Sequence, residues 1–292
     1  MGRNSQNWIH KDQNAINAKS WVRSCEEKFP TFIKASIEKS KIYGEGKIPQ
    51  NIEGKDDIST EIVYLNMDTV SAIKEVWCKD QDVYKIAALN FASYKNPGGG
   101  YLDGATAQEE CLCSESTLFN VIAPFYDVFY KPHLKKLNGG LYGDDLIYSP
   151  GILFFRDGKQ MIADVITCAA PNYYSIKKYN RCSYEDVIHA MVSRIDHILY
   201  AVYKEDAKVV ILGAFGCGVF MNDPVIVSQI FHYFLKTKYD GCFMEAIFAV
   251  PTFRNEKTFQ VFKESGEKMI QFLETEGNVV HGQAPELIKY MI

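Results

Sequence analysis

The sequence lacks several patterns that would assign it quickly to a class of protein. No stretch reaches the roughly 18 apolar residues of a membrane span, and the amino-terminal residues contain no apolar signal-peptide core. The eight cysteines form no C-x-x-C pair, and no histidine stands at ligand spacing from Cys111 and Cys113. A metal site is therefore not indicated. We expect reduced thiols in a cytoplasmic or nuclear protein, with no membrane contact.

Positive charge is not in excess either. The chain has 32 Lys and Arg residues against 36 Asp and Glu residues, which gives a formal net charge of -4. Grooves that bind nucleic acid are usually basic, so direct DNA binding is not expected. An anionic ligand would have to be held locally by backbone amides. The 292 residues, 47% of them hydrophobic, are enough for one large domain or two small ones.

Strand-like and helix-like segments alternate after an amino-terminal region of different character. Residues 1–42 have helical spacing with a break at Pro30, and the polar segment 43–59 predicts a loop. We expect residues 1–59 to form a helical extension packed on a main domain of residues 60–292. Strands are predicted over 61–66, 84–91, 146–150, 152–156, 161–168, 208–213 and 242–250, and helices over 69–77, 108–121, 184–204, 223–235 and 255–275. Residues 124–145 predict a loop with a short helix or strand. This α/β pattern predicts a mixed sheet between helices.

One stretch joins three glycines to two adjacent carboxylates. Residues 98–100 are all glycine, follow the strand predicted over 84–91 and precede a helix that begins Gln-Glu-Glu at residues 108–110. Glycine has no Cβ, so this loop can adopt φ > 0 and present its amides to an anion at a helix N-terminus. An anion-binding loop beside two acids favours a hydrolase that acts on a phosphate-bearing molecule.

A second glycine loop occupies residues 213–222, G-A-F-G-C-G-V-F-M-N, between a predicted strand and a helix with Pro224 in its first turn. Its order, G-x-x-G-x-G, differs from the G-x-G-x-x-G of a Rossmann loop, and no G-K-[ST] of a P-loop follows. These glycines can direct successive amides toward an anion, and two such loops suit a diphosphate. A tight turn that binds nothing is the alternative interpretation.

The run G-G-G-Y-L-D-G-A-T-A-Q-E-E resembles the G-G-G-x(6-8)-Q-E-E signature of poly(ADP-ribose) glycohydrolases in the macrodomain superfamily. The preceding N-F-A-S-Y-K-N-P is most similar to the microbial type, and the resemblance extends roughly over residues 60–255. It implies the macrodomain arrangement of sheet and helices and a second loop that holds the diphosphate of ADP-ribose. Met221 stands where glycine is common in this family. The ligand-binding residues that we expect are Asn96, Gly98, Gly99, Gly100, Gln108, Gly213, Phe215, Gly216, Cys217, Gly218, Val219 and Phe220.

The resemblance assigns catalysis to the second glutamate of Q-E-E, Glu110, and we expect this residue to act as general acid and then as general base. Glu109, aided by Asn96, would hold the ribose hydroxyls. Neighbouring residues on a helix diverge by about 100°, so the two glutamates are not expected to act as a nucleophile and acid on opposite sides of the bond. This scheme requires no metal and no cofactor.

Three functions stay open at this point. The first is hydrolysis of the ribose–ribose O-glycosidic bonds of poly(ADP-ribose), with ADP-ribose as product. The second is removal of ADP-ribose from ADP-ribosylated proteins or another acceptor, and the third is a non-catalytic ADP-ribose-binding module. The presence of both glutamates speaks against the third. Residues 170–172 are a further weak candidate for the ligand side, and Phe125, Tyr126 and Tyr173 are possible adenine contacts.

Overall fold

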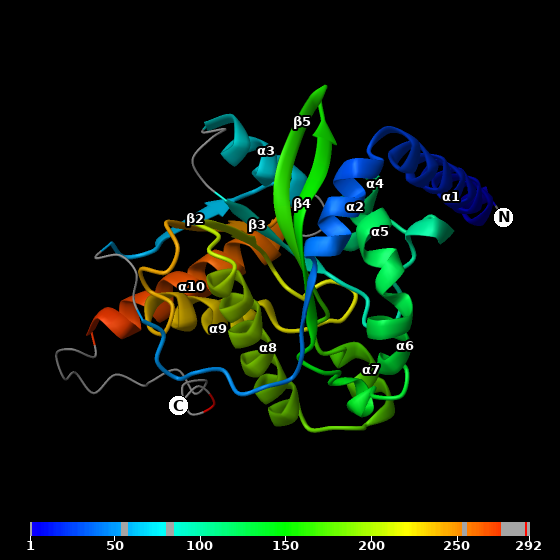
Figure 1. Cartoon of the computed structure of the whole chain (residues 1–292). Coiled ribbons are helices and arrows are strands. Elements are labelled where there is room, and N and C mark those ends of the chain that lie inside the picture. Colours follow the sequence, from blue (N-terminus) through cyan, green and yellow to red (C-terminus); the bar gives the residue numbers. More distant parts are fainter. Residues whose placement is uncertain (1, 54–57, 80–84, 253–255, 276–289, 291–292) are drawn as a thin grey trace.

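The computed structural model describes residues 2–53, 58–79, 85–252, 256–275 and residue 290. A seven-stranded sheet crosses this part of the chain in the order β1-β4-β5-β3-β6-β7-β2 (Figure 1). Its strands are β1 (Lys41–Tyr43), β2 (Glu61–Leu65), β3 (Ile86–Phe91), β4 (Leu146–Arg156), β5 (Lys159–Cys168), β6 (Val209–Leu212) and β7 (Glu245–Ala249). Neighbouring strands from β5 through β2 are parallel, whereas β4 is antiparallel to both β5 and β1. The predicted mixed sheet is confirmed.

Helices cover both faces of this sheet (Figure 1). The bounds are α1 (Gly2–Lys28), α2 (Pro30–Lys39), α3 (Thr69–Lys79), α4 (Gln108–Ser114), α5 (Leu118–Ile122), α6 (Lys131–His133), α7 (Tyr173–Tyr179), α8 (Tyr184–Lys204), α9 (Pro224–Lys236) and α10 (Glu256–Thr275). One buried cluster joins the sheet to α8, α9 and α10, and a second joins it to α1 through α5. The sheet therefore lies between two helical layers, as predicted.

The central strands are apolar on both sides because both faces are covered. Ala87 and Leu89 of β3 pack in the cluster with α8 to α10, whereas Ile86 and Ala88 pack in the cluster with α1 to α5. Successive side chains of a strand point to opposite faces, so a strand buried on both faces is a continuous apolar run. Because β5, β3, β6, β7 and β2 are parallel, their carboxyl ends lie along the same side of the sheet.

The turn predicted at residues 150–151 is wrong, because β4 continues through it as one strand. Gly151 adopts φ 71°, and the pairing with β5 shifts register between Ser149 and Ile152, which is the signature of a β-bulge. The buried carboxylate of Asp164 accepts a 2.8 Å hydrogen bond from the Gly151 amide. This side-chain hydrogen bond replaces the ladder hydrogen bond that the bulge interrupts.

The single helix predicted over 108–121 is also wrong, because the chain leaves the helix between α4 and α5. Ser116 forms a β-bridge with Phe154, and the Thr117 amide donates to the Leu153 carbonyl at 3.0 Å. The Trp21 indole of α1 donates to the Ser116 carbonyl at 3.0 Å. Contacts with β4 and α1, distant in sequence, thus replace the helical hydrogen bonds at this point.

Two short elements were not predicted. Residues 41–43 were assigned to the end of a helix and a loop, but they pair with β4 as β1, and no element was predicted at α7. Residues 124–145 contain short helical turns, and the other predicted elements agree to within a few residues. Tyr84, Asn255 and the tail from residue 276, apart from residue 290, lie outside the described residues. No helix in the described chain is long and apolar enough to cross a membrane.

Candidate active site

A cleft of about 860 Å³ opens at the edge where the parallel strands end. Its walls come from segments that follow β2, β3, β6 and β7, namely residues 68–70, 91–93, 106–112, 214–220 and 249–251. Ligands of parallel α/β folds bind at this edge of the sheet, and the volume lies in the range of small-molecule sites. Among the described residues that line the cleft there is no Lys, Arg or His. Any anion bound here therefore has to be held by neutral donors.

Glu110 lines the cleft from the first turn of α4 and is almost fully buried. Its Oε1 accepts a hydrogen bond of 2.9 Å from the Gly100 amide, and its Oε2 accepts one of 3.0 Å from the Ala107 amide. The second bond is the reach of an N3 glutamate back to the start of its own helix. Both carboxylate oxygens are therefore fixed by backbone donors.

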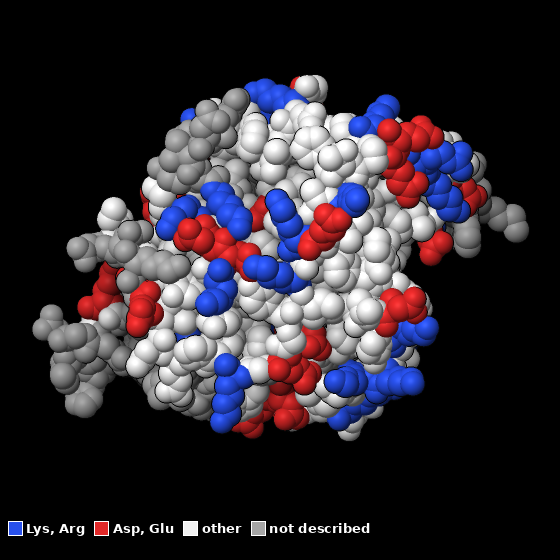
Figure 2. Space-filling model, viewed as in Figure 1, with Lys and Arg blue, Asp and Glu red and all other residues white. Residues whose placement is uncertain are grey.

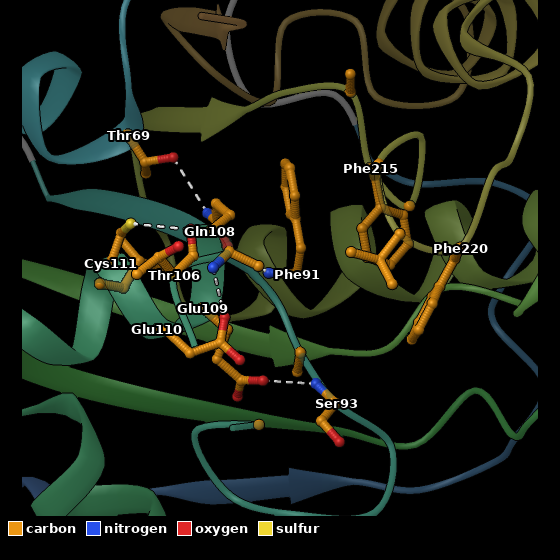
Figure 3. Close-up of a pocket in the computed structure, with 18 of the residues that line it drawn as sticks. Thr69, Phe91, Ser93, Thr106, Gln108, Glu109, Glu110, Cys111, Phe215 and Phe220 are labelled. Carbon is orange, nitrogen blue, oxygen red and sulfur yellow. Dashed lines mark hydrogen bonds between the residues drawn. The ribbon is translucent and has the colours of Figure 1, made fainter. Parts of the chain in front are cut away.

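Glu109 is held still more tightly, beside Glu110 (Figure 3). Its Oε2 accepts from the Ser93 amide at 2.6 Å, and its Oε1 accepts from the Gly98 amide at 3.2 Å and the Asn90 side chain at 3.3 Å. Burial raises the pKa of Glu109 to about 8, the charge of Glu110 adds to this effect, and the three donors oppose it. Burial therefore favours the protonated form of the Glu109 carboxyl at neutral pH.

Gly99 brings the two carboxylates together. A Cβ at this position would stand 2.6 Å from Oε1 of Glu110 and 3.0 Å from Oε2 of Glu109, and its φ is 59°. Although the two glutamates leave the helix in different directions, their carboxylates thus converge on one glycine. The divergence expected from helical geometry is offset by the side-chain torsions of this turn. Only glycine fits there without moving a carboxylate.

The amides of the triple glycine are not directed at open space, contrary to our expectation of an anion-binding loop. The Gly98 and Gly100 amides donate to the two glutamates, and the Gly99 amide donates to the Asn96 carbonyl at 3.0 Å. The first loop therefore positions the carboxylates. Of the residues expected in it, Asn96, Gly99 and Gly100 line the cleft, whereas Gly98 does not and packs against Phe119.

Gln108 also lines the cleft, but its amide group is used inside the protein. Its oxygen accepts from the Phe91 amide at 2.8 Å, and its nitrogen donates to the Leu89 carbonyl at 2.9 Å and the Thr69 hydroxyl at 3.1 Å (Figure 3). The side chain thus continues the hydrogen-bond ladder at the end of β3 and joins α4 to α3. This arrangement supports a positioning role.

The second glycine loop, in contrast, leaves donors available. The amides of residues 216, 218, 219 and 220 have no hydrogen-bond partner among the described residues. Gly216 adopts φ 70°, and a Cβ there would stand 2.5 Å from the Ala170 side chain. Met221 adopts φ 59°, which is unfavourable for a residue with a side chain and fits the resemblance, in which glycine is common there. This loop therefore has free amide donors in the cleft, which the first loop does not.

The residues expected in the second loop divide into two groups. Those whose atoms line the cleft are Phe215, Gly216, Cys217, Gly218, Val219 and Phe220. Gly213 does not line it, since a Cβ there would stand 2.7 Å from the Ala249 carbonyl oxygen of the neighbouring strand. Glycine at this position serves close packing behind the loop.

Aromatic rings form the wall opposite the carboxylates. Phe91 and Phe215 pack edge to face with centroids 5.6 Å apart, and Phe220 lies beyond them (Figure 3). Sequence reasoning missed Phe91, Ser93 and the segments 68–70 and 249–251. Their signal was their position at the ends of predicted strands or just after them. The aromatic residues considered for adenine, Phe125, Tyr126 and Tyr173, do not line the cleft, whereas Ala170 of the weak candidate segment does.

The sheet and the cleft at its edge define a macrodomain-like protein. The family model described as "Microbial-type PARG, catalytic domain" matches residues 11–157, half of the chain, and the chain belongs to this family. The match begins within the segment that we expected to be an extension. No curated protein matches the chain.

Solved structures of the same fold extend this finding over most of the chain. The poly(ADP-ribose) glycohydrolase of Thermomonospora curvata is 26% identical, with a TM-score of 0.76 over 87% of this chain and 99% of that one. Its complex with the inhibitor ADP-HPD gives a TM-score of 0.75 at the same identity and coverage. The enzyme of Deinococcus radiodurans in complex with ADP-ribose is 28% identical, with a TM-score of 0.71 over 81% and 97% of the two chains.

Proposed function

We propose that this chain hydrolyses the ribose–ribose O-glycosidic bonds of poly(ADP-ribose) and releases ADP-ribose. The observation that carries the proposal is the pair of buried carboxylates converging on Gly99, in a cleft whose opposite loop offers unpaired amides. Membership of the microbial-type PARG family supports the same activity. The structures of relatives bound to ADP-ribose and to ADP-HPD support the ligand class.

The diphosphate binds, in this proposal, to the amides of residues 216–220. Four unpaired amides in one short loop can form a nest for an anion without a cationic side chain. A diphosphate held there extends one ribose along the aromatic wall toward the carboxylates. The second loop thus fixes the position of the reacting carbon, and the first loop fixes the acids that act on it.

Glu110 performs the proton transfers. It protonates the oxygen that leaves the anomeric carbon of the distal ribose, and the C–O bond breaks to give an oxocarbenium-like ribose. The resulting Glu110 carboxylate then takes a proton from water, whose oxygen bonds to the anomeric carbon. Glu109, held by three donors, hydrogen-bonds the ribose hydroxyls and holds the sugar in place.

Replacing Glu110 with glutamine tests this assignment. The amide of Glu110→Gln keeps the size of the side chain but cannot donate and recover a proton, so we expect turnover of automodified polymer to fall by about 10²–10⁴-fold. ADP-ribose affinity by calorimetry should change little, because the diphosphate contacts remain. Glu38→Gln, an exchange on an exposed helix surface, is the matched control and should behave like the wild type. Normal turnover by Glu110→Gln contradicts the assignment.

Two substrates distinguish this proposal from its alternatives. The protein is incubated with automodified polymer and, separately, with mono-ADP-ribosylated protein. Loss of polymer with release of ADP-ribose supports the proposal. Loss of the single unit alone indicates a hydrolase of ADP-ribosylated proteins, and binding without loss of either indicates a non-catalytic module.

A further inference from the structure

An exposed group of tyrosines and cations lies next to the second glycine loop, outside the cleft. It comprises α7 and the residues that follow it, with Tyr174, Tyr179 and Tyr184 exposed to 50%, 56% and 41%. Lys and Arg side chains gather in Figure 2 at the lower right, where Figure 1 shows α6 and α7. We call the set Tyr174, Lys177, Lys178, Tyr179, Arg181 and Tyr184 the α7 surface.

The cations of this surface lie over its rings. Lys178 is 5.9 Å from the Tyr174 centroid and 5.3 Å from the Tyr179 centroid, and Arg181 is 5.0 Å from the Tyr179 centroid. No carboxylate in the described chain forms a salt bridge with Lys177, Lys178 or Arg181. Cation–π contacts fix the rings while the charged heads keep their hydrogen-bond donors for an anion.

The α7 surface is joined to the cleft by direct contacts. The Tyr174 amide donates to the Phe220 carbonyl at 2.9 Å, and Phe220 lines the cleft. The Phe220 ring packs against Tyr142, with centroids 6.2 Å apart. Tyr142 in turn stacks on Tyr94 at 4.3 Å. Ser93, the neighbour of Tyr94, donates its amide to Glu109. The α7 surface therefore adjoins the cleft at Phe220, and buried Tyr142 and Tyr94 support this part of the molecule from within.

The leaving group of the proposed reaction contains a base and phosphates, which tyrosine rings and cationic side chains can bind. In the proposed reaction, the group that leaves the anomeric carbon is the next ADP-ribose unit, which carries an adenine and two phosphates. Exposed rings bind bases by stacking, and lysine and arginine heads bind phosphates. The cleft itself has no cation among its described lining residues, whereas Lys177, Lys178 and Arg181 lie in or just after α7, whose Tyr174 contacts the cleft residue Phe220. Glu185 and Asp186 at the start of α8 limit the positive area on one side.

We propose that the α7 surface binds the ADP-ribose unit on the leaving-group side of the scissile bond. The adenine stacks on Tyr174 or Tyr179, and the diphosphate contacts Lys177, Lys178 and Arg181. This inference rests on the proposed function, since it takes the acceptor-side unit of the same polymer. It makes the protein prefer oligomers of ADP-ribose to the monomer.

The test compares oligomer and monomer binding in the Glu110→Gln background, where turnover does not interfere. Affinities for ADP-ribose and for a purified oligomer of at least two units are measured by calorimetry. We expect the oligomer to bind more tightly than ADP-ribose. Tyr174→Ala with Tyr179→Ala should weaken oligomer binding by about fivefold or more, the range of one lost stacked base, and leave ADP-ribose binding unchanged. Lys177→Glu with Lys178→Glu should do the same and reduce the salt dependence of oligomer binding.

One control and four outcomes decide this test. Phe32→Ala with Lys34→Ala removes an exposed aromatic ring and a lysine from α2, on another surface, and should change neither affinity. Equal affinities of the parent for monomer and oligomer overturn the inference, as does unchanged oligomer binding by both α7 variants. Equal competition by single-stranded DNA also overturns it. Failure of the wild type to bind ADP-ribose or to degrade polymer overturns the proposed function and this inference together, whereas the preceding outcomes leave the function intact.

Discussion

At the scale of single residues, the site depends on Gly99, a residue that has no side chain and takes no part in the reaction itself. Gly99 occupies the space between the two carboxylates and adopts a left-handed backbone conformation. Its neighbours Gly98 and Gly100 contribute amides to Glu109 and Glu110. The glycine triplet thus determines where the acids stand, which explains why three glycines and two glutamates occur in one short stretch.

Substitution of Gly99 tests this role. In Gly99→Ala, the new methyl group would contact both carboxylates, so at least one must move away from its amide donor. Because displacement of a catalytic group by about 1 Å can cost 10²-fold, we expect polymer hydrolysis to fall by about that factor. Gly158→Ala is the matched control, since Gly158 has φ 71° but no atom within 4 Å of its Cβ position.

Comparing the two variants separates contact with the carboxylates from backbone strain. Both carry the strain of a left-handed alanine, roughly 1 kcal/mol, which unfolding by urea measures. Only Gly99→Ala should lose activity. Equal activity of the two variants, with both folded, would show that the carboxylates do not depend on this glycine.

At the scale of elements, segments whose ends are marked by local chemistry were predictable from the sequence. Helix α8 begins with a Ser183 and Asp186 capping box, and α9 begins with Asp223 and Pro224. These residues satisfy or replace amides of the first turn within a few positions. The glycine loops were equally visible, because φ > 0 is a local requirement.

Elements fixed by distant partners were not predictable. Ser116 interrupts a helical pattern because β4 and α1 supply other hydrogen bonds, and β1 exists because β4 has a free edge. The same reason explains the errors within the site. Whether the amides of Gly98 and Gly100 face a ligand or a carboxylate, and whether Gln108 binds a ligand or β3, depends on tertiary contacts that no local pattern records.

Helix α1 supports the active-site loop through one close backbone contact. A Cβ on Gly104 would stand 2.0 Å from the Lys11 carbonyl oxygen and 3.1 Å from the Ala15 amide nitrogen, and φ is 79°. Since both neighbours are backbone atoms of α1, Gly104→Ala must displace the helix. We expect a loss of roughly 2–5 kcal/mol in the free energy of unfolding and faster hydrogen exchange in α1.

The same control applies to this prediction. Gly158→Ala carries the backbone strain without the contact and should lose only about 1 kcal/mol. Unchanged exchange in α1 of Gly104→Ala would mean that the helix does not depend on this contact. The division of the chain at residues 59 and 60 stays a prediction, although β1 within the first part pairs with the main sheet.

At the scale of the whole molecule, two surfaces suit different parts of the proposed polyanionic substrate: the cleft offers neutral amide donors, and the α7 surface offers cations. The cleft has acids and unpaired amides but no cation among its described lining residues. Lys178 and Arg181, without a salt bridge in the described chain, lie over the tyrosine rings of the α7 surface. None of the eight cysteines, all within the described residues, forms a disulfide. The stability of the fold therefore comes from the two buried clusters that hold the sheet between its helices.

A crystal structure of this protein with ADP-ribose tests the central claim most directly. The account predicts the diphosphate on the amides of residues 216–220, within about 3 Å of their nitrogens, and the distal anomeric carbon beside the Glu110 carboxyl. A nucleotide bound elsewhere, or a Glu110 side chain turned away from the ribose, would contradict it.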